Sequence, residues 1–169
     1  MNDKFLDQNT LKSLNFKSVG SDVSISKNAT IIGEKNISLG SNVRIDDFTI
    51  ISAENGSLIV GSNVHIGGQS YFGCSGNIQI GNNVNISQGS RFYSKINDYL
   101  EFEVTEKYIL KKIKIEDNVI IGSGTVIIGE CTISEGVTIG ALSFVKGNLK
   151  SWSVYAGNPI KFINTRKKK

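Results

Sequence analysis

Aliphatic residues recur at every sixth position between residues 115 and 145. The stretch reads IEDNVI, IGSGTV, IIGECT, ISEGVT and IGALSF, with isoleucine opening each block and Val145 following the last. The fifth position of each block is small or branched, as at Val119, Thr125 and Ser143. A period of six matches neither the 3.6-residue repeat of a helix nor the two-residue repeat of a strand. It is typical of short strands wound into a triangular prism, so we predict an all-β protein with a parallel β-helix.

The same period occupies most of the chain before this stretch. Its inward positions come in threes, with a spacing of six inside each group and of eight or nine between groups. The groups are Val19, Ile25 and Ile31; Leu39, Ile45 and Ile51; Val60, Ile66 and Phe72; and Ile80, Ile86 and Phe92. The extra residues, near Lys35, Asn55 and Ser75, therefore fall at one corner of successive coils. We predict about six coils over residues 18–147.

The segment 1–17 precedes the repeat and is predicted to cap its open end. Leu11 and Leu14 have helical spacing, and Asn9 or Thr10 is a candidate N-cap for a short helix. Stacked repeats need such a cap because the terminal coil has no neighbour to cover its core.

Two further segments depart from the repeat. Residues 94–112, SKINDYLEFEVTEKYILKK, are predicted to form a loop protruding from one corner of the fourth coil. Long loops on a rigid scaffold often carry function. Residues 148–169 form a C-terminal extension that ends in the basic tail RKKK.

Amino-acid composition limits the class of protein and the cellular compartment that we expect. Eighteen glycines against one proline suit a chain that turns every few residues. The polar start and the lack of an apolar run of about 18 residues predict no secretory signal and no membrane segment. Cys74 and Cys131 lie inside the repeat and are interpreted as small core residues, which favours a reduced, cytoplasmic setting. The net charge of +4 lies partly in the tail, and no nucleic-acid-binding motif accompanies it.

The repeat [LIV]-G-x-x-x-x, the corner loop and the ending YAGNPIK at 155–161 together resemble the hexapeptide-repeat acyltransferases. VHIG at 64–67, FYS at 92–94 with the following DY, and IGALS at 139–143 make the chain most similar to the sugar acetyltransferases of surface-polysaccharide biosynthesis. The resemblance implies a left-handed helix, a homotrimer with active sites between subunits, and acetyl-CoA as co-substrate in an outer groove.

His65 is the only histidine of the chain and the first candidate for a general base, because an imidazole titrates near neutral pH. The matching positions one coil earlier and one coil later are Arg44 and Asn85. Stacked strands lie about 4.8 Å apart, so the three side chains are predicted to form an outward ladder. We assign His65 and Asn85 to catalysis and Arg44 to acceptor binding.

The corner loop supplies the remaining candidates at the acceptor. In the best-known galactoside and maltose transferases that the chain resembles, the catalytic histidine lies at this loop, which has none here. Asp98 is therefore the alternative base, and a base-free reaction is open for an amine that arrives neutral. Lys95 and Tyr99 are candidate acceptor contacts.

The resemblance places the coenzyme A contacts on the last coils and the tail. Ser123, Ala141 and Ser143 are small residues against which a pantetheine arm can lie, although a tight prism turn also requires small residues. Lys146, Lys161 and Arg166 are the candidate cations for its phosphates. No metal site is expected, and a γ-class carbonic anhydrase is excluded because its zinc needs three histidines.

The leading hypothesis is an acetyl-CoA-dependent transferase that acetylates a hydroxyl of a sugar for lipopolysaccharide, O-antigen or capsule, with a histidine general base. The alternative is N-acetylation of a nucleotide-linked amino sugar. A non-catalytic β-helix scaffold is the hypothesis from another class, and the presence of His65, the loop and the GNPIK ending argues against it.

Overall fold

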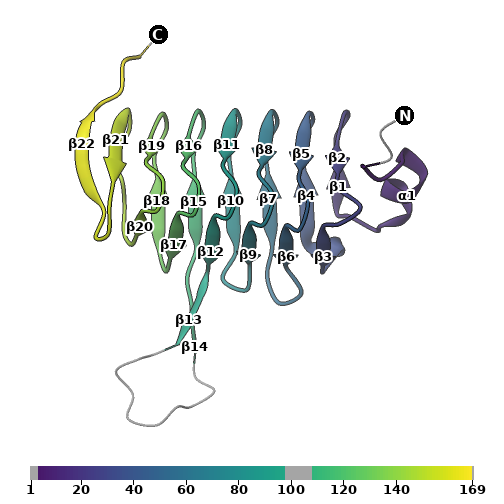
Figure 1. Cartoon of the computed structure of the whole chain (residues 1–169). Helices are drawn as coiled ribbons and strands as arrows, with labels where there is room; N and C mark the ends of the chain where they lie inside the picture. Colours follow the sequence, from purple (N-terminus) through teal and green to yellow (C-terminus); the bar gives the residue numbers. More distant parts are fainter. Residues whose placement is uncertain (1–3, 98–107, 169) are drawn as a thin grey trace.

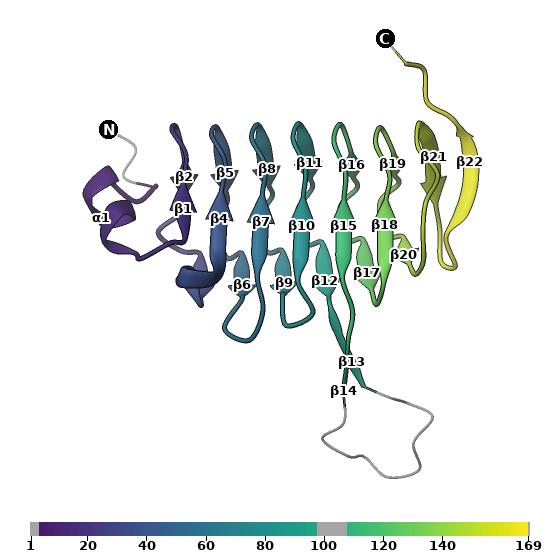
Figure 2. The same ribbon diagram turned by 180° about the vertical axis from the view of Figure 1, so that it is seen from behind.

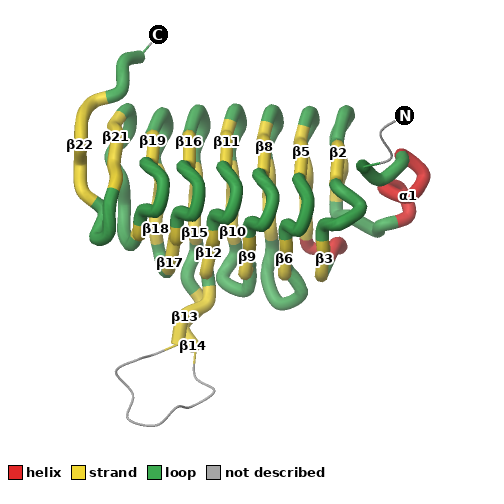
Figure 3. Tube along the Cα trace, viewed as in Figure 1, coloured by secondary structure: helices red, strands yellow, loops and turns green. Residues whose placement is uncertain are grey.

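The computed structural model describes residues 4–97 and 108–168. Nearly all regular structure is short β-strand, with one α-helix, α1 (Gln8–Ser13), and one 3-10 turn, η1 (Glu34–Asn36). Figure 1 shows the strands stacked side by side along one axis, with α1 at the N-terminal end. Figure 3 shows the turns that join them, stacked in the same way along the prism edges.

The chain visits three parallel sheets in turn. The first sheet contains β1 (Ser18–Val19), β4 (Ile37–Leu39), β7 (Leu58–Val60), β10 (Ile78–Ile80), β15 (Ile113–Ile115) and β18 (Cys131–Ile133). The second contains β2 (Ser24–Ile25), β5 (Val43–Ile45), β8 (Val64–Ile66), β11 (Val84–Ile86), β16 (Ile120–Ile121), β19 (Thr138–Ile139), β21 (Ser153–Ala156) and β22 (Lys161–Thr165). The third contains β3 (Thr30–Ile32), β6 (Ile50–Ser52), β9 (Tyr71–Gly73), β12 (Arg91–Tyr93), β17 (Val126–Ile128) and β20 (Phe144–Val145). The prediction of a left-handed parallel β-helix of about six coils is confirmed.

The core is a column of aliphatic side chains along the axis of the prism. The predicted inward positions are buried from the second coil onward, and the rings of Phe72 and Phe92 stack with centroids 4.4 Å apart. Val19, in the first coil, remains 39% exposed because no full coil covers it. The period of six therefore marks the core, except at the end of the stack.

The corner between the first and second sheets carries asparagines in the left-handed conformation. Asn42, Asn63, Asn83 and Asn118 have φ between 55° and 61°, a region that asparagine tolerates better than most residues. Their side chains form a ladder in which each Nδ2 donates to the next Oδ1, at 2.9, 3.1 and 3.3 Å. This asparagine corner therefore pins the register of successive coils.

The N-terminal segment caps the prism, but its helix begins at a different residue from the one expected. Asp7 is the N-cap, and its Oδ1 accepts hydrogen bonds from the backbone of Asn9 and Thr10 at 2.9 Å. Asn9 and Thr10 were the predicted caps; they lie inside the helix because the extended backbone of Asp7 brings its carboxylate below the first turn. Leu11 is buried against the core.

The predicted loop begins and ends as an antiparallel hairpin. β13 (Lys95–Asn97) pairs with β14 (Tyr108–Leu110), between β12 of the third sheet and β15 of the first. Figures 1 and 2 both show this hairpin projecting from the edge of the prism opposite the strands of the second sheet.

The C-terminal extension adds to the second sheet. β21 is a further parallel strand beside β19, and β22 folds back antiparallel to β21. The end of the chain is fastened to the asparagine corner, where Arg166 Nη1 donates to the carbonyls of Asn118 and Gly136 at 2.7 and 3.1 Å.

Candidate active site

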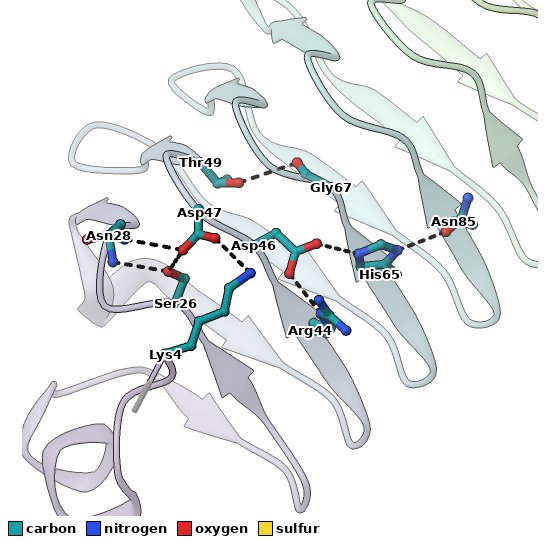
Figure 4. Close-up of polar contacts among 10 residues, drawn as sticks. All are labelled: Lys4, Ser26, Asn28, Arg44, Asp46, Asp47, Thr49, His65, Gly67 and Asn85. Carbon is teal, nitrogen blue, oxygen red and sulfur yellow. Dashed lines mark hydrogen bonds and ion pairs between the residues drawn. The ribbon is translucent and has the colours of Figure 1, made fainter. Parts of the chain in front are cut away.

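The predicted ladder exists on the outer face of the second sheet. In β5, β8 and β11 the two flanking residues point into the core and the middle residue points outward. Arg44 is the register partner of His65, and His65 is the register partner of Asn85. Figure 4 shows the three side chains extending from neighbouring strands. The structure therefore brings three of the predicted site residues together.

Both ring nitrogens of His65 lie next to oxygen atoms. Nδ1 is 3.1 Å from Asn85 Oδ1, Nε2 is 2.8 Å from Asp46 Oδ2, and the side chain is 41% exposed. This arrangement suits an imidazolium that donates from both nitrogens. Turning over the Asn85 amide suits the neutral ring, with Nδ1 as acceptor. Asp46 holds Nε2 in either state, so Nδ1 is the nitrogen available to a substrate.

Asp46 is a site residue that the sequence reasoning missed. One carboxylate oxygen accepts from Arg44 Nε at 2.8 Å, the other lies next to His65, and the side chain is only 17% exposed. Burial alone would raise the pKa of Asp46, but the hydrogen bonds from His65 and Arg44 outweigh burial and lower it. The two-residue spacing of Arg44 and Asp46 would place both side chains on one face of an extended chain, but β5 ends at Ile45 and Asp46 lies at the corner that follows.

The N-terminal segment supports this cluster from the adjacent coil. Phe5 forms an antiparallel bridge with Ser26, and its ring centre lies 5.5 Å from the Arg44 guanidinium carbon. Lys4 Nζ lies 2.7 Å from Asp47 Oδ2, and the other oxygen of Asp47 accepts from Ser26 Oγ. Figure 4 shows the contacts of Asp47 with Lys4 and Ser26 beside the Asp46–His65 pair. The cap thus also positions the residues around His65.

Two hollows flank His65. The first, which we call the Arg44 hollow, has a volume of about 480 Å³ and is lined by Asn42, Arg44, Asn63, Val64, His65, Asn83, Val84 and Asn85. The second, the Asp46 hollow, has a volume of about 320 Å³ and is lined by Asp46, His65, Gly67, Gly68, Asn85, Ser87, Gln88 and Ser123. Only the second includes a carboxylate. His65 borders both hollows.

The small residues predicted for coenzyme A lie in different settings. Ser123 lines the Asp46 hollow, and Ala141 is exposed on a later coil. Ser143 is only 2% exposed, its Oγ donates to the Gly140 carbonyl at 2.6 Å, and it accepts from the Gly157 amide at 3.0 Å. The hydroxyl of Ser143 therefore stabilises the last turn of the prism through these two hydrogen bonds.

The predicted cations of the coenzyme A site also separate. Lys146 and Lys161 are exposed near the C-terminal end of the stack. Arg166 is half-buried, and its Nη1 donates to the backbone carbonyls of Asn118 and Gly136 at the asparagine corner. Its Nη1 is therefore occupied by a structural contact rather than presented to a phosphate.

Lys95, the loop candidate within the described residues, does not lie beside His65 of the same chain. Lys95 lies on β13, where its Nζ is 3.2 Å from the centre of the Tyr108 ring. The hairpin leaves the edge between the third and first sheets, whereas His65 lies on the second. Asp98 and Tyr99 lie outside the residues that the structure describes.

Residues 4–97 and 108–168 contain no group of three or more His, Cys, Asp or Glu side chains placed to hold a metal ion. The only α-helix among them has six residues, and none is long and apolar enough to cross a bilayer.

Comparison with known proteins gives matches over nearly the whole chain. The bacterial transferase hexapeptide family (six repeats) matches residues 112–147. The dTDP-4-amino-4,6-dideoxy-D-glucose acyltransferase of Escherichia coli is 36% identical over 174 residues, which cover 98% of this chain and 90% of that protein.

Solved structures match equally well. AntD, an N-acyltransferase from Bacillus cereus in complex with dTDP and 3-hydroxybutyryl-CoA, is 37% identical with a TM-score of 0.90, covering 99% of this chain and 92% of AntD. A variant of AntD in complex with dTDP-4-amino-4,6-dideoxyglucose and coenzyme A is 36% identical with a TM-score of 0.91, covering 99% of this chain and 93% of the variant. A hexapeptide-repeat acetyltransferase of Vibrio cholerae, at 21% identity and a TM-score of 0.66, shares the fold.

Proposed function

This chain belongs to the hexapeptide-repeat acyltransferases, and we propose that it transfers an acyl group from acyl-coenzyme A to the amino group of a nucleotide-linked amino sugar. The amino acceptor is supported by relatives named for a dTDP-linked amino sugar and for N-acyl transfer. They favour the second of the two sequence-based hypotheses, N-acylation, over acetylation of a sugar hydroxyl.

The observation that carries catalysis at this site is the Asp46–His65 pair between two hollows. The amine attacks the thioester carbonyl, a C–N bond forms, and the C–S bond breaks with release of coenzyme A. His65 Nδ1 accepts the proton that the nitrogen loses, after the acceptor has replaced the Asn85 amide beside it. Asp46 holds Nε2–H and stabilises the imidazolium, which then protonates the departing thiolate.

The donor and the assembly complete the proposal. Acetyl-CoA is the donor we propose first, with Ser123, Ala141, Lys146 and Lys161 as candidate contacts. We also propose a homotrimer: the hairpin that bears Lys95 projects from the edge opposite the sheet of His65, so an acceptor contact by Lys95 would be made at the site of a neighbouring copy.

Release of coenzyme A from acetyl-CoA and longer acyl-CoAs tests the proposal, with dTDP-4-amino-4,6-dideoxyglucose as acceptor. A matched nucleotide sugar with a hydroxyl in place of the amine is the control. We expect turnover with the amine only, and a fall of about 10²–10⁴-fold in His65→Ala. Turnover with the hydroxyl sugar alone would contradict N-acylation and support the hypothesis of O-acylation. Failure of every acceptor together with no binding of acyl-CoA would favour the scaffold hypothesis.

The His65→Ala result separates the reaction from its mechanism. If amine acylation persists in this variant at the wild-type rate, the acceptor assignment stands and the general-base role of His65 does not. The reaction would then require only a neutral amine placed next to the thioester, with no side chain acting as base.

A further inference from the structure

We infer that the Arg44 hollow binds the diphosphate of the nucleotide-linked acceptor, with the Arg44 guanidinium as its principal contact. The inference rests on the proposed function and assigns a part of the substrate to a part of the site. Its four supports are the remaining hydrogen-bond donors of Arg44, the lining of the hollow, the fixation of Arg44 before a ligand binds, and the spacing of the coils.

Arg44 retains donors that face no acceptor in the described structure. Its Nε donates to Asp46 Oδ1 at 2.8 Å, and no residue among 4–97 and 108–168 accepts from its two terminal nitrogens. The side chain is 53% exposed. A guanidinium that is fixed through Nε presents the remaining edge as a planar fork, which matches two oxygens of a phosphate.

The rest of the hollow favours an anion. None of its lining residues is a carboxylate, and Asn63 and Asn83 each use one Nδ2 hydrogen in the asparagine ladder and keep a second. Asp46, which holds Arg44 through Nε, lines not this hollow but the neighbouring one, where we place the amino end of the sugar. The Arg44 hollow thus presents a guanidinium edge and amide donors, with no carboxylate in its lining.

Arg44 is also held in place before any ligand arrives. The ring of Phe5 lies 5.5 Å from its guanidinium carbon on one side, and Asp46 binds Nε on another. A long cationic side chain loses considerable freedom when it binds a ligand, and prior fixation lowers that loss.

The spacing of the coils matches the acceptor. Arg44 and His65 are register partners on adjacent strands, which lie about 4.8 Å apart. In a 4-amino hexose linked through C1, the diphosphate and the amine lie on opposite sides of one pyranose ring. A sugar that lies along the axis of the prism can therefore place its amine at His65 and its diphosphate at Arg44.

Calorimetric titration of dTDP into wild type, Arg44→Gln and Arg44→Lys tests the inference. We expect Arg44→Gln to weaken dTDP binding by about tenfold or more. Arg44→Lys keeps the charge but lacks the planar pair of donors, so its affinity for dTDP should lie between those of wild type and Arg44→Gln. Thymidine, which has no phosphate, should bind wild type and Arg44→Gln equally. Arg91→Gln, on the outward face of the third sheet, is the matched control and should bind dTDP as wild type does.

The outcomes distinguish the inference from the function on which it rests. Equal dTDP affinity in wild type and Arg44→Gln, or no binding to wild type, overturns the diphosphate subsite even if amine acylation is observed. Binding of dTDP that depends on Arg44, in a protein that acylates no amine, keeps the subsite and overturns the proposed reaction. Unfolding temperatures of the three variants, measured without ligand, exclude loss of fold as the cause.

Discussion

The Oδ2 of Asp46 lies 2.8 Å from the Nε2 of His65, across the boundary between two coils. This contact commits one nitrogen of the only histidine to the protein and leaves Nδ1, beside Asn85, for the substrate. In the proposed mechanism, a residue from the preceding coil therefore fixes which nitrogen of the ring accepts the proton, and the acceptor takes the place of the Asn85 amide.

Asp46→Asn should lower kcat for acyl transfer by about one to two orders of magnitude, which is less than removal of the general base itself. The amide cannot stabilise the imidazolium as the carboxylate does, so the acid limb of the pH–rate profile should move as well. Steady-state rates across pH provide the measurement. An unchanged kcat and pH profile would show that His65 works without Asp46.

Acid should destabilise the wild type more steeply than Asp46→Asn. The pKa of Asp46 is lowered in the folded chain from its ordinary value of 3.8, so the unfolded chain binds the proton more readily. Its contribution is therefore complete above about pH 3.8 and is lost as pH falls through the folded pKa. Thermal unfolding of both proteins between pH 6 and about pH 3 provides the comparison, and parallel curves would contradict it.

Cys74 and Cys131 should resist thiol reagents in the native protein. Burial raises the pKa of each thiol to about 12, so almost no thiolate is present at pH 8. A chromogenic disulfide reagent should report no thiols until denaturant is added, and then both. Rapid labelling of the folded protein would mean that the coils around these residues open readily.

Phe92→Ala should lower the free energy of unfolding by about 3–5 kcal/mol, because it removes a fully buried ring stacked on Phe72. Val19→Ala is the matched control, since Val19 lies in the open first coil and should change stability by only about 0.5 kcal/mol. Denaturant unfolding measures both. Similar losses of unfolding free energy in the two variants would contradict tighter packing at Phe92 than at Val19.

Phe5→Leu should raise the KM for the nucleotide sugar several-fold and leave the KM for acyl-CoA unchanged. The leucine keeps apolar volume but loses the aromatic face next to Arg44, a contact typically worth about 0.5–2 kcal/mol. Phe16→Leu, in the same cap and packed on the core, is the control for a general loss of stability. Equal effects in both variants would contradict a positioning role for Phe5.

The fold followed from the sequence because each coil repeats one physical requirement. Each face of each coil needs one aliphatic side chain that points into the core. Ile45, Ile66 and Ile86 could therefore be identified as core residues from the repeat alone, with no knowledge of distant contacts. The same repeat gave the register of Arg44, His65 and Asn85, since residues at matching phase have to stack. Site geometry along the axis was therefore predictable.

Contacts between residues at non-matching positions of the repeat were not predictable in this way. Asp46 lies at a corner, and its contact with His65 depends on the conformations of both side chains. Phe5 reaches Arg44 only because the N-terminal cap folds back along β2. Arg166, a predicted phosphate contact, donates through Nη1 to the Asn118 and Gly136 carbonyls, which come from two successive coils. Such contacts depend on the path of the segments at the two ends of the chain, which periodicity does not encode.

The asparagine ladder continues unbroken from Asn83 to Asn118, although 35 residues separate them and only 20 separate Asn63 from Asn83. The hairpin is thus an insertion whose two ends return to neighbouring points, and lengthening it changes the closure entropy only logarithmically. The prism can accordingly accept a segment of different length at the edge between the third and first sheets. If the loop contacts the acceptor as proposed, replacing this hairpin would change acceptor preference while the coils and His65 stay unaltered.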